Sequence, residues 1–131
     1  KIKSLFDIVS NNVKRKNYRI TINGRNHKTK DGTPERDFIH VEDLCEIHKR
    51  IYMYLKKNRN IILNCGSGTR FSVLEIVREF EKMIKKKINI SYKIINPDET
   101  KTICADVSML NNLLKIRVKK NKISHYLLDY L

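Results

Sequence analysis

The chain of 131 residues has no tryptophan, two prolines and three cysteines, and no long apolar run. Cys45, Cys65 and Cys104 are odd in number and widely spaced, which predicts neither a disulfide framework nor a CxxC metal pair. Reduced thiols in a cytoplasmic protein are therefore expected. Since no apolar run approaches the about 18–20 residues that span a bilayer, no contact with a membrane is predicted. A signal peptide is not expected either, because the amphipathic start lacks a small-residue cleavage site.

Acidic residues are scarce, with 14 Asp and Glu against 28 Lys and Arg, which gives a net charge of +14. Such a charge suggests a polyanionic partner, and a basic nucleic-acid-binding module is kept as an alternative. However, the basic clusters at 13–16, 56–59, 85–87 and 119–122 fall where helices end or turns begin. Lysines at helix C-termini complement the helix dipole. No aromatic platform accompanies them, so nucleic acid is not the expected partner.

The length corresponds to one domain, or to one part of a larger domain. The first residue is Lys1 rather than Met, and the last, Leu131, lies inside an apolar pattern that has not run out. Neither end looks like a natural terminus. We therefore expect residues 1–131 to be one portion of a longer chain.

Hydrophobic periodicity predicts helices and strands in alternation. Val41 to about Lys57 has helical spacing, and Ser72 with Glu75 forms a capping box before another helix. His48 falls on the apolar face of the first of these helices, which predicts a buried core histidine. Asp106 is the expected N-cap of a short helix. The other expected elements are a helix marked by Leu5, Ile8, Val9 and Val13, strands marked by Tyr18, Ile20, Ile22 and by Ile90, Tyr92, Ile94, and a final amphipathic segment marked by Ile123, Tyr126, Leu127 and Tyr130.

Residues 60–64, "NIILN", are wholly apolar at the centre, which predicts a strand buried on both faces. The fold class is therefore α/β. Three or four short strands make a poor free-standing sheet, so we expect the remaining strands to lie elsewhere.

Three patterns resemble functional motifs without matching them. "GSGTRF" follows a strand and opens a helix, but Phe71 replaces the third glycine of a dinucleotide-binding loop, and a tight turn is the better interpretation. Tyr52 and Lys56 have the spacing of a catalytic tyrosine–lysine pair, but no serine or nicotinamide loop accompanies them. His40, Cys45 and His48 do not have a common zinc spacing, so no metal site is expected.

Arg36 lies in "TPERDFIHVEDL", between a turn and a hydrophobic anchor formed by Phe38 and Ile39. A guanidinium is a permanently charged planar fork that fits two phosphate oxygens, and a side chain held on both flanks loses less entropy on binding. Alternatively, Arg36 is a surface residue paired with Glu35 or Asp37, worth at most about 1 kcal/mol. The residues alone leave the two interpretations open.

Three segments, "ING…TKDGTPERDFIHVEDL", "ILNCGSGTRFSVLEIVREFEKMIKKKI" and "CADVSML", resemble in order the C-terminal half of the NAD-dependent UDP-glucose 4-epimerase family. This family belongs to the extended short-chain dehydrogenases/reductases. The resemblance implies the substrate-binding portion of an extended Rossmann-type fold, without the dinucleotide-binding half. Related nucleotide-sugar dehydratases are similar, so a dehydratase or a non-catalytic paralogue stays an alternative.

The resemblance also implies residue roles. Arg36 would bind the diphosphate of a UDP-sugar, and Thr21, Ile22 and Asn23 would lie along the uracil. Asn96 and Glu99 would occupy a motif that contacts phosphate and ribose. Asp37, Phe38, His40 and Asp43 would be structural.

This chain departs from the family in that motif, where Asn96 replaces a second phosphate-binding arginine. Asp98 and Glu99 replace its glycine and its acid, and Asn23 replaces an aromatic residue on the uracil. One lost charge-assisted hydrogen bond weakens binding by about ten- to a hundred-fold, unless Lys93 or Lys101 compensates.

The resemblance places the NAD loop and the catalytic tyrosine and lysine in a preceding half. There, NAD takes the hydride from C4 of the sugar and returns it to the other face. No catalytic or cofactor-binding residue is expected in this chain, which is predicted to be inactive alone. A homodimer is implied for the complete protein.

Overall fold

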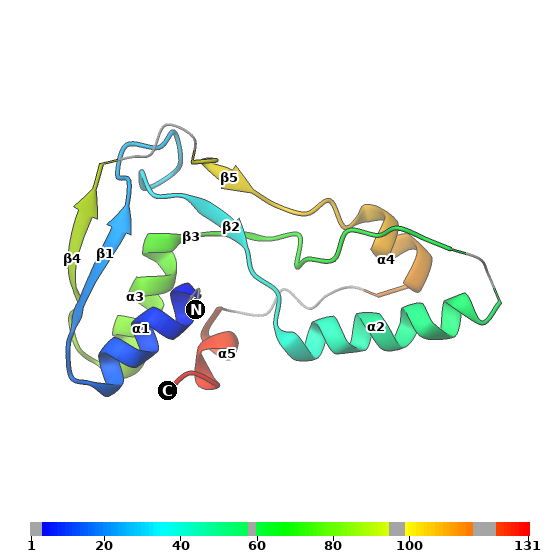
Figure 1. Cartoon of the computed structure of the whole chain (residues 1–131), viewed down its shortest axis with the longest axis horizontal. Helices are drawn as coiled ribbons and strands as arrows, with labels where there is room; N and C mark the ends of the chain where they lie inside the picture. Colours follow the sequence, from blue (N-terminus) through cyan, green and yellow to red (C-terminus); the bar gives the residue numbers. More distant parts are fainter. Residues whose placement is uncertain (1–3, 58–59, 95–98, 117–122) are drawn as a thin grey trace. The chain divides into compact units, whose positions relative to one another are not determined.

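The computed structural model describes residues 4–57, 60–94, 99–116 and 123–131 (Figure 1). The elements in chain order are α1 (Leu5–Lys14), β1 (Arg19–Asn23), β2 (Glu35–Asp37), α2 (Val41–Leu55), β3 (Arg70–Ser72), α3 (Val73–Ile84), β4 (Asn89–Lys93), β5 (Thr102–Ile103), α4 (Ser108–Leu114) and α5 (Ile123–Leu128). The chain forms two compact units. The first combines residues 1–36, 71–102 and 121–131, and the second combines residues 37–70 and 103–120.

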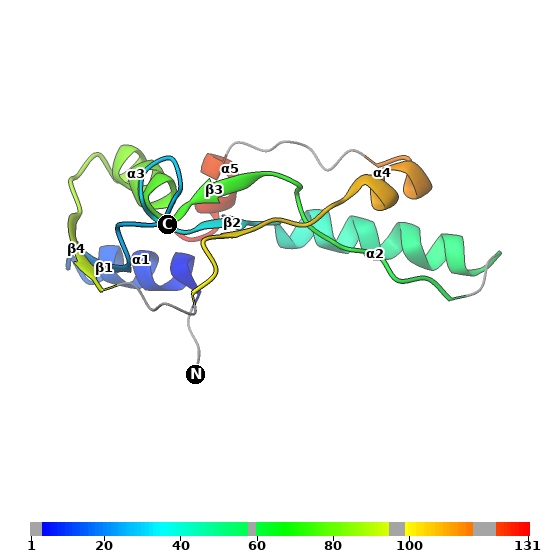
Figure 2. The same cartoon turned by 90° about the horizontal axis from the view of Figure 1, so that it is seen from above.

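The first unit is built on a two-stranded parallel ladder of β1 and β4, in which Ile20 lies opposite Ile90 and Ile22 opposite Tyr92. Figures 1 and 2 show the two strands side by side, with α1 lying against β1 and α3. β1 alternates strictly between exposed and buried residues, because one face of the ladder packs on the helices. The strands expected around Ile20 and Ile90 are thereby confirmed.

The core of the first unit is aliphatic and aromatic. The Phe6 ring lies 6.4 Å from the Phe80 ring and 5.2 Å from the Tyr130 ring, which joins α1 to α3 and to the C-terminal segment. The Ser10 hydroxyl, buried with them, donates to the Tyr130 carbonyl. The buried hydrophobic residues of this unit are Phe6, Val9, Ile20, Ile22, Ile76, Val77, Phe80, Ile88, Ile123, Tyr126 and Leu127.

The second unit packs α2 against α4 around Ile47, Leu110 and Leu114. His40 caps α2, with its Nδ1 accepting from the Glu42 N–H at 3.3 Å, and Asp43 lies in the first turn as expected. Cys45 and His48 are both exposed, so the interpretation of His48 as a core residue was wrong. Its ring instead bonds the Leu44 carbonyl at 2.8 Å on the helix surface.

Two further predictions were wrong. Residues 60–64 belong to no strand, and the Ile62 side chain is 93% exposed. A β-strand requires hydrogen bonds to a neighbouring strand, so an apolar segment without such a neighbour does not form one. The N-cap of α4 is Val107 rather than Asp106, whose Oδ1 accepts from the Ser108 N–H at 2.9 Å one residue away from the cap.

A three-stranded sheet with the order β3-β2-β5 was not expected from the sequence. Its strands have two or three residues each, too few to show a hydrophobic period. The boundary between the two units falls within all three strands. Within the described ranges, no helix is long and apolar enough to cross a bilayer.

Candidate functional site

Residues 21–23 form the carboxyl end of β1. Thr21 and Asn23 are exposed, whereas Ile22 is 3% exposed and lies in the core. The Thr21 hydroxyl lies 2.9 Å from that of Ser91, and the Gly24 N–H donates to the Lys93 carbonyl at 3.1 Å. The carboxyl ends of β1 and β4 are thus at one edge of the ladder, the edge at which open α/β sheets bind ligands.

The residues after these strands add positive charge to the same edge. The Arg25 guanidinium lies 5.0 Å from the centre of the Tyr92 ring, a cation–π distance. Lys93 ends β4 and is exposed. Asn96 and Asp98, singled out in the sequence, lie outside the described residues.

Arg36 lies on β2, in the first unit. The Glu35 N–H donates to the Lys101 carbonyl at 2.8 Å, and the Val73 N–H donates to the Pro34 carbonyl at 3.0 Å. The backbone directly before Arg36 is therefore fixed by two long-range hydrogen bonds. This agrees with the expectation that the turn holds the guanidinium in place.

The guanidinium is partly engaged within the protein. Its Nη1 donates to the Glu35 carbonyl at 2.8 Å and reaches the Lys101 carbonyl at 3.5 Å. Its Nη2 lies 3.6 Å from Glu99 Oε1, and the two side chains are 26% and 24% exposed. The structure thus brings together Arg36 and Glu99, two of the residues singled out in the sequence. Glu99 is therefore an ion-pair partner of the Arg36 charge.

A polar network that the sequence analysis missed supports the loop before Arg36. Asp31 accepts from the Thr33 N–H at 2.9 Å, from the Thr33 hydroxyl at 2.7 Å and from the Ser72 hydroxyl. Burial acts most strongly on Asp31 and opposes ionisation, but hydrogen bonds from Ser72 and Thr33, with help from Lys30, outweigh it and lower the pKa. Gly32 has φ +81°, and a Cβ there would lie 1.9 Å from the Arg25 carbonyl oxygen. The turn-forming residues "KDGT" were the feature of the sequence that could have indicated the turn formed by Asp31 and Thr33.

Asp37, in the second unit, has a structural role, as expected. Its Oδ1 accepts from the Ser67 N–H at 2.9 Å and the Ser67 hydroxyl at 2.6 Å. Its Oδ2 accepts from the Gly68 N–H at 3.0 Å and the Ala105 N–H at 3.2 Å. The carboxylate therefore ties the loop at 66–69 to the segment at 105.

The same contacts explain why "GSGTRF" is a turn. Backbone N–H groups in such a loop bind phosphate in nucleotide sites, but here those of Ser67 and Gly68 donate to Asp37. A cavity of about 360 Å³ lies beside Asp37, Cys65 and Cys104. Burial, followed by the charge of Asp37, raises the pKa of the Cys104 thiol, which makes it a poor nucleophile.

The other two patterns do not form the sites that they resemble. The Lys56 ammonium lies 4.9 Å from the Tyr52 ring centre, and Tyr52 is 62% exposed. Among the described residues, no group of His, Cys, Asp and Glu has the geometry of a metal site.

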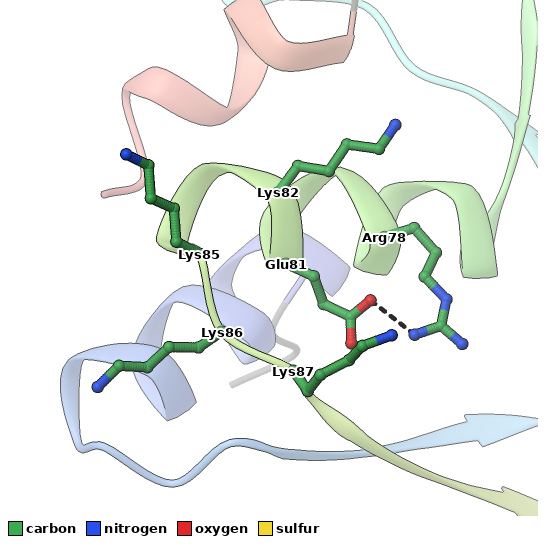
Figure 3. A pocket seen from close by; sticks show the side chains of 6 residues that line it. All are labelled: Arg78, Glu81, Lys82, Lys85, Lys86 and Lys87. Carbon is green, nitrogen blue, oxygen red and sulfur yellow. Dashed lines mark hydrogen bonds and ion pairs between the residues drawn. The ribbon is translucent and has the colours of Figure 1, made fainter.

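A basic cavity of about 420 Å³ lies at the C-terminal end of α3, beside Arg78, Lys82, Lys85, Lys86 and Lys87 (Figure 3). Glu81, which also lines this cavity and is buried, accepts from Arg78 Nη1 at 2.6 Å and from the Ile88 N–H at 2.7 Å. Burial of Glu81 opposes ionisation, but Arg78, the Ile88 N–H and Lys87 together lower the pKa. Figure 3 shows Lys82, Lys85 and Lys86 pointing away from Glu81. The cations therefore do not converge on a small anion.

The comparisons with known proteins agree with this α/β arrangement. The model of the NAD dependent epimerase/dehydratase family matches residues 2–66. UDP-glucose 4-epimerase of Bacillus subtilis is 39% identical over 88 residues, which cover 66% of this chain and 26% of the relative. UDP-glucose 4-epimerase 1 of Oryza sativa is 34% identical over 104 residues, covering 76% of this chain and 29% of the relative. The chain is a segment of a UDP-glucose 4-epimerase-like NAD-dependent epimerase/dehydratase.

Solved structures support the same conclusion over nearly the whole chain. UDP-glucose 4-epimerase from Bifidobacterium longum, solved in complex with NAD⁺ and UDP, has a TM-score of 0.86 and 26% identity, covering 98% of this chain and 38% of that one. The UDP-Glc/GlcNAc 4-epimerase of Campylobacter jejuni has a TM-score of 0.85 and 27% identity, covering 99% of this chain and 41% of that one. The α/β fold class is confirmed as part of an epimerase fold of the short-chain dehydrogenase/reductase type. The chain spans about a quarter to three tenths of the length of the curated relatives it matches.

Proposed function

We propose that this chain is the C-terminal, UDP-sugar-binding portion of an NAD-dependent UDP-glucose 4-epimerase, with Arg36 clamping the diphosphate. One observation carries the proposal: the guanidinium of Arg36 is positioned by fixed backbone in the unit that contains the carboxyl ends of β1 and β4. A planar cation held in this way fits two phosphate oxygens at a small entropic cost.

Thr21, Ile22 and Asn23 are proposed to lie along the uracil, with Ile22 contributing backbone because its side chain is buried. Asn96 is proposed to add a further contact, whereas Glu99 pairs with Arg36. NAD and the tyrosine–lysine pair that moves the proton are assigned to the rest of the protein, so this portion is inactive alone. A cytoplasmic homodimer is part of the same proposal.

The decisive experiment is calorimetry of the complete protein with UDP. Arg36→Ala is expected to lose about ten-fold or more in affinity, because one charge-assisted contact is worth about 1.5–3 kcal/mol. Arg19→Ala is the matched control, since Arg19 is an exposed arginine at the amino end of β1. Equal affinities of the wild type and Arg36→Ala would reject the role of Arg36.

Turnover by the complete protein separates the enzymatic alternatives. Interconversion of UDP-glucose and UDP-galactose supports the epimerase. Binding of UDP without turnover supports a non-catalytic paralogue, and release of water from a nucleotide sugar supports a dehydratase.

The basic residues around α3 are the observation that favours a second function, binding of nucleic acid through the phosphate backbone. Such binding falls steeply with salt. Fluorescence anisotropy that shows tight, salt-sensitive binding of RNA or DNA, without competition by UDP, would favour this function over the first.

A further inference from the structure

Glu99 places a negative charge beside the Nη2 side of the Arg36 guanidinium. Nη1 is held by two carbonyl oxygens, whereas Nη2 lies 3.6 Å from Glu99 Oε1. This distance suits an ion pair but exceeds that of a hydrogen bond. Both side chains are about three-quarters buried, so solvent screens their attraction less than that of a surface pair.

We propose that Glu99 is an intramolecular competitor of the diphosphate for Arg36, rather than an additional contact to the ligand. The inference rests on the proposed function, because it assumes that Arg36 is the phosphate-binding residue. An anion that takes Nη2 must displace the Glu99 carboxylate, or place its own negative charge beside it. Either alternative weakens the apparent affinity.

The geometry of the pair makes displacement possible. The carboxylate contacts Nη2 without a close hydrogen bond, whereas a diphosphate offers several oxygens and more charge to the same fork. A ligand without phosphate has no anionic oxygens that would bind Arg36 in place of Glu99. The effect of Glu99 should therefore depend on the phosphates of the ligand and disappear for the nucleoside.

The test is the affinity of the complete protein for UDP and for uridine, in the wild type and in Glu99→Gln. The substitution keeps the shape of the side chain and removes the charge. The affinity for UDP is expected to rise by roughly three- to ten-fold, the size of a partly screened ion pair. The affinity for uridine is expected to stay unchanged. Glu79→Gln is the matched control, because Glu79 is 27% exposed and is paired with Lys82.

A weaker or unchanged affinity of Glu99→Gln for UDP overturns the inference. A weaker affinity for both ligands would identify Glu99 as a direct contact to the ribose. In an Arg36→Ala background, Glu99→Gln should no longer raise the affinity for UDP, because the guanidinium for which Glu99 and the diphosphate compete is absent.

The two hypotheses fail separately. If Arg36→Ala leaves UDP affinity intact, the proposed function fails. If Arg36→Ala weakens binding but Glu99→Gln does not tighten it, only the competition fails. Circular dichroism checks the fold of each variant, and the Glu99→Gln result with the two ligands decides the inference even if Arg36→Ala does not fold.

Discussion

Arg36 and Asp37 are adjacent in the sequence and have opposite charges, but their side chains interact with different parts of the protein. The Asp37 carboxylate accepts from backbone N–H groups on both oxygens and connects two loops of the second unit. Arg36 has one side held by carbonyl groups and the other opposite Glu99. Asp37 thus binds backbone donors of the second unit, whereas Arg36 has an ion-pair partner far away in the sequence.

Replacement of Asp37 tests its structural role. Asp37→Asn is expected to lower the free energy of unfolding by about 2–3 kcal/mol, because an amide NH₂ then faces backbone N–H donors that need an acceptor. The midpoint of urea denaturation, followed by circular dichroism, measures the change. Glu42→Gln is the control, since the Glu42 side chain is 88% exposed. Equal midpoints of the two variants would contradict the role.

At this scale the sequence indicated Arg36 as a positioned cation and Asp37 as structural. It gave no sign that Ser72 joins the turn formed by Asp31 and Thr33, or that Glu99 faces Arg36. These two contacts join residues that are far apart in the chain, so no spacing rule applies to them.

At the scale of elements, helix starts were the most predictable features. The capping box at α3 is confirmed: the Glu75 N–H donates to the Ser72 hydroxyl at 3.0 Å, and the Ser72 N–H donates to the Glu75 carboxylate at 2.8 Å. An equivalent box at α1 uses Ser4 and Asp7. The residues of a capping box lie within one turn, so the sequence can indicate the box. A single candidate residue is a weaker signal, because Asp106 is not the N-cap of α4.

The two capping boxes differ in burial, so the stability costs of removing their serine hydroxyls can be compared. Ser72→Ala is expected to cost about 2 kcal/mol, because Ser72 is 2% exposed and its hydroxyl also donates to Asp31. Ser4→Ala should cost about 0.5–1 kcal/mol, since that box is exposed. Thermal unfolding of both variants measures the difference. A larger loss for Ser4→Ala would contradict the importance of the Asp31 contact.

Strands were less predictable than helices. β1 and β4 were found because five residues of alternation are enough to show a period. The short strands β2, β3 and β5 gave no such signal, and residues 60–64 gave a signal without forming a strand. A ladder is a property of two segments, so one segment cannot determine it.

For the whole molecule, the lowered pKa values of Asp31 and Glu81 link stability to pH. Because their pKa values are lower in the folded state, stability is fully present above the unfolded values of about 4. It is lost as the pH falls through the lower folded values. Both carboxylates belong to the first unit, so acid should destabilise that unit.

Urea denaturation at pH 7, 5 and 3 checks this linkage. The variant Asp31→Asn/Glu81→Gln is expected to be less stable at pH 7 and to lose less stability between pH 5 and pH 3. Glu42→Gln, at an exposed position, should keep the wild-type pH dependence. If the double variant keeps the wild-type dependence of stability on pH, then other titratable groups cause the loss of stability in acid.

The sequence by itself determined the α/β class, the helices, the capping box of α3, the excess of positive charge, and the motif around Arg36 that resembles nucleotide-sugar epimerases. Periodicity, capping and turn chemistry are local, so they are encoded within one or two turns of the chain. Only the tertiary structure decided that Glu99 lies opposite Arg36 and that the Asp37 carboxylate accepts hydrogen bonds from two loops. It also decided that residues 60–64 do not pair with another strand. Each of these depends on segments that become neighbours through packing, which no short stretch of residues specifies.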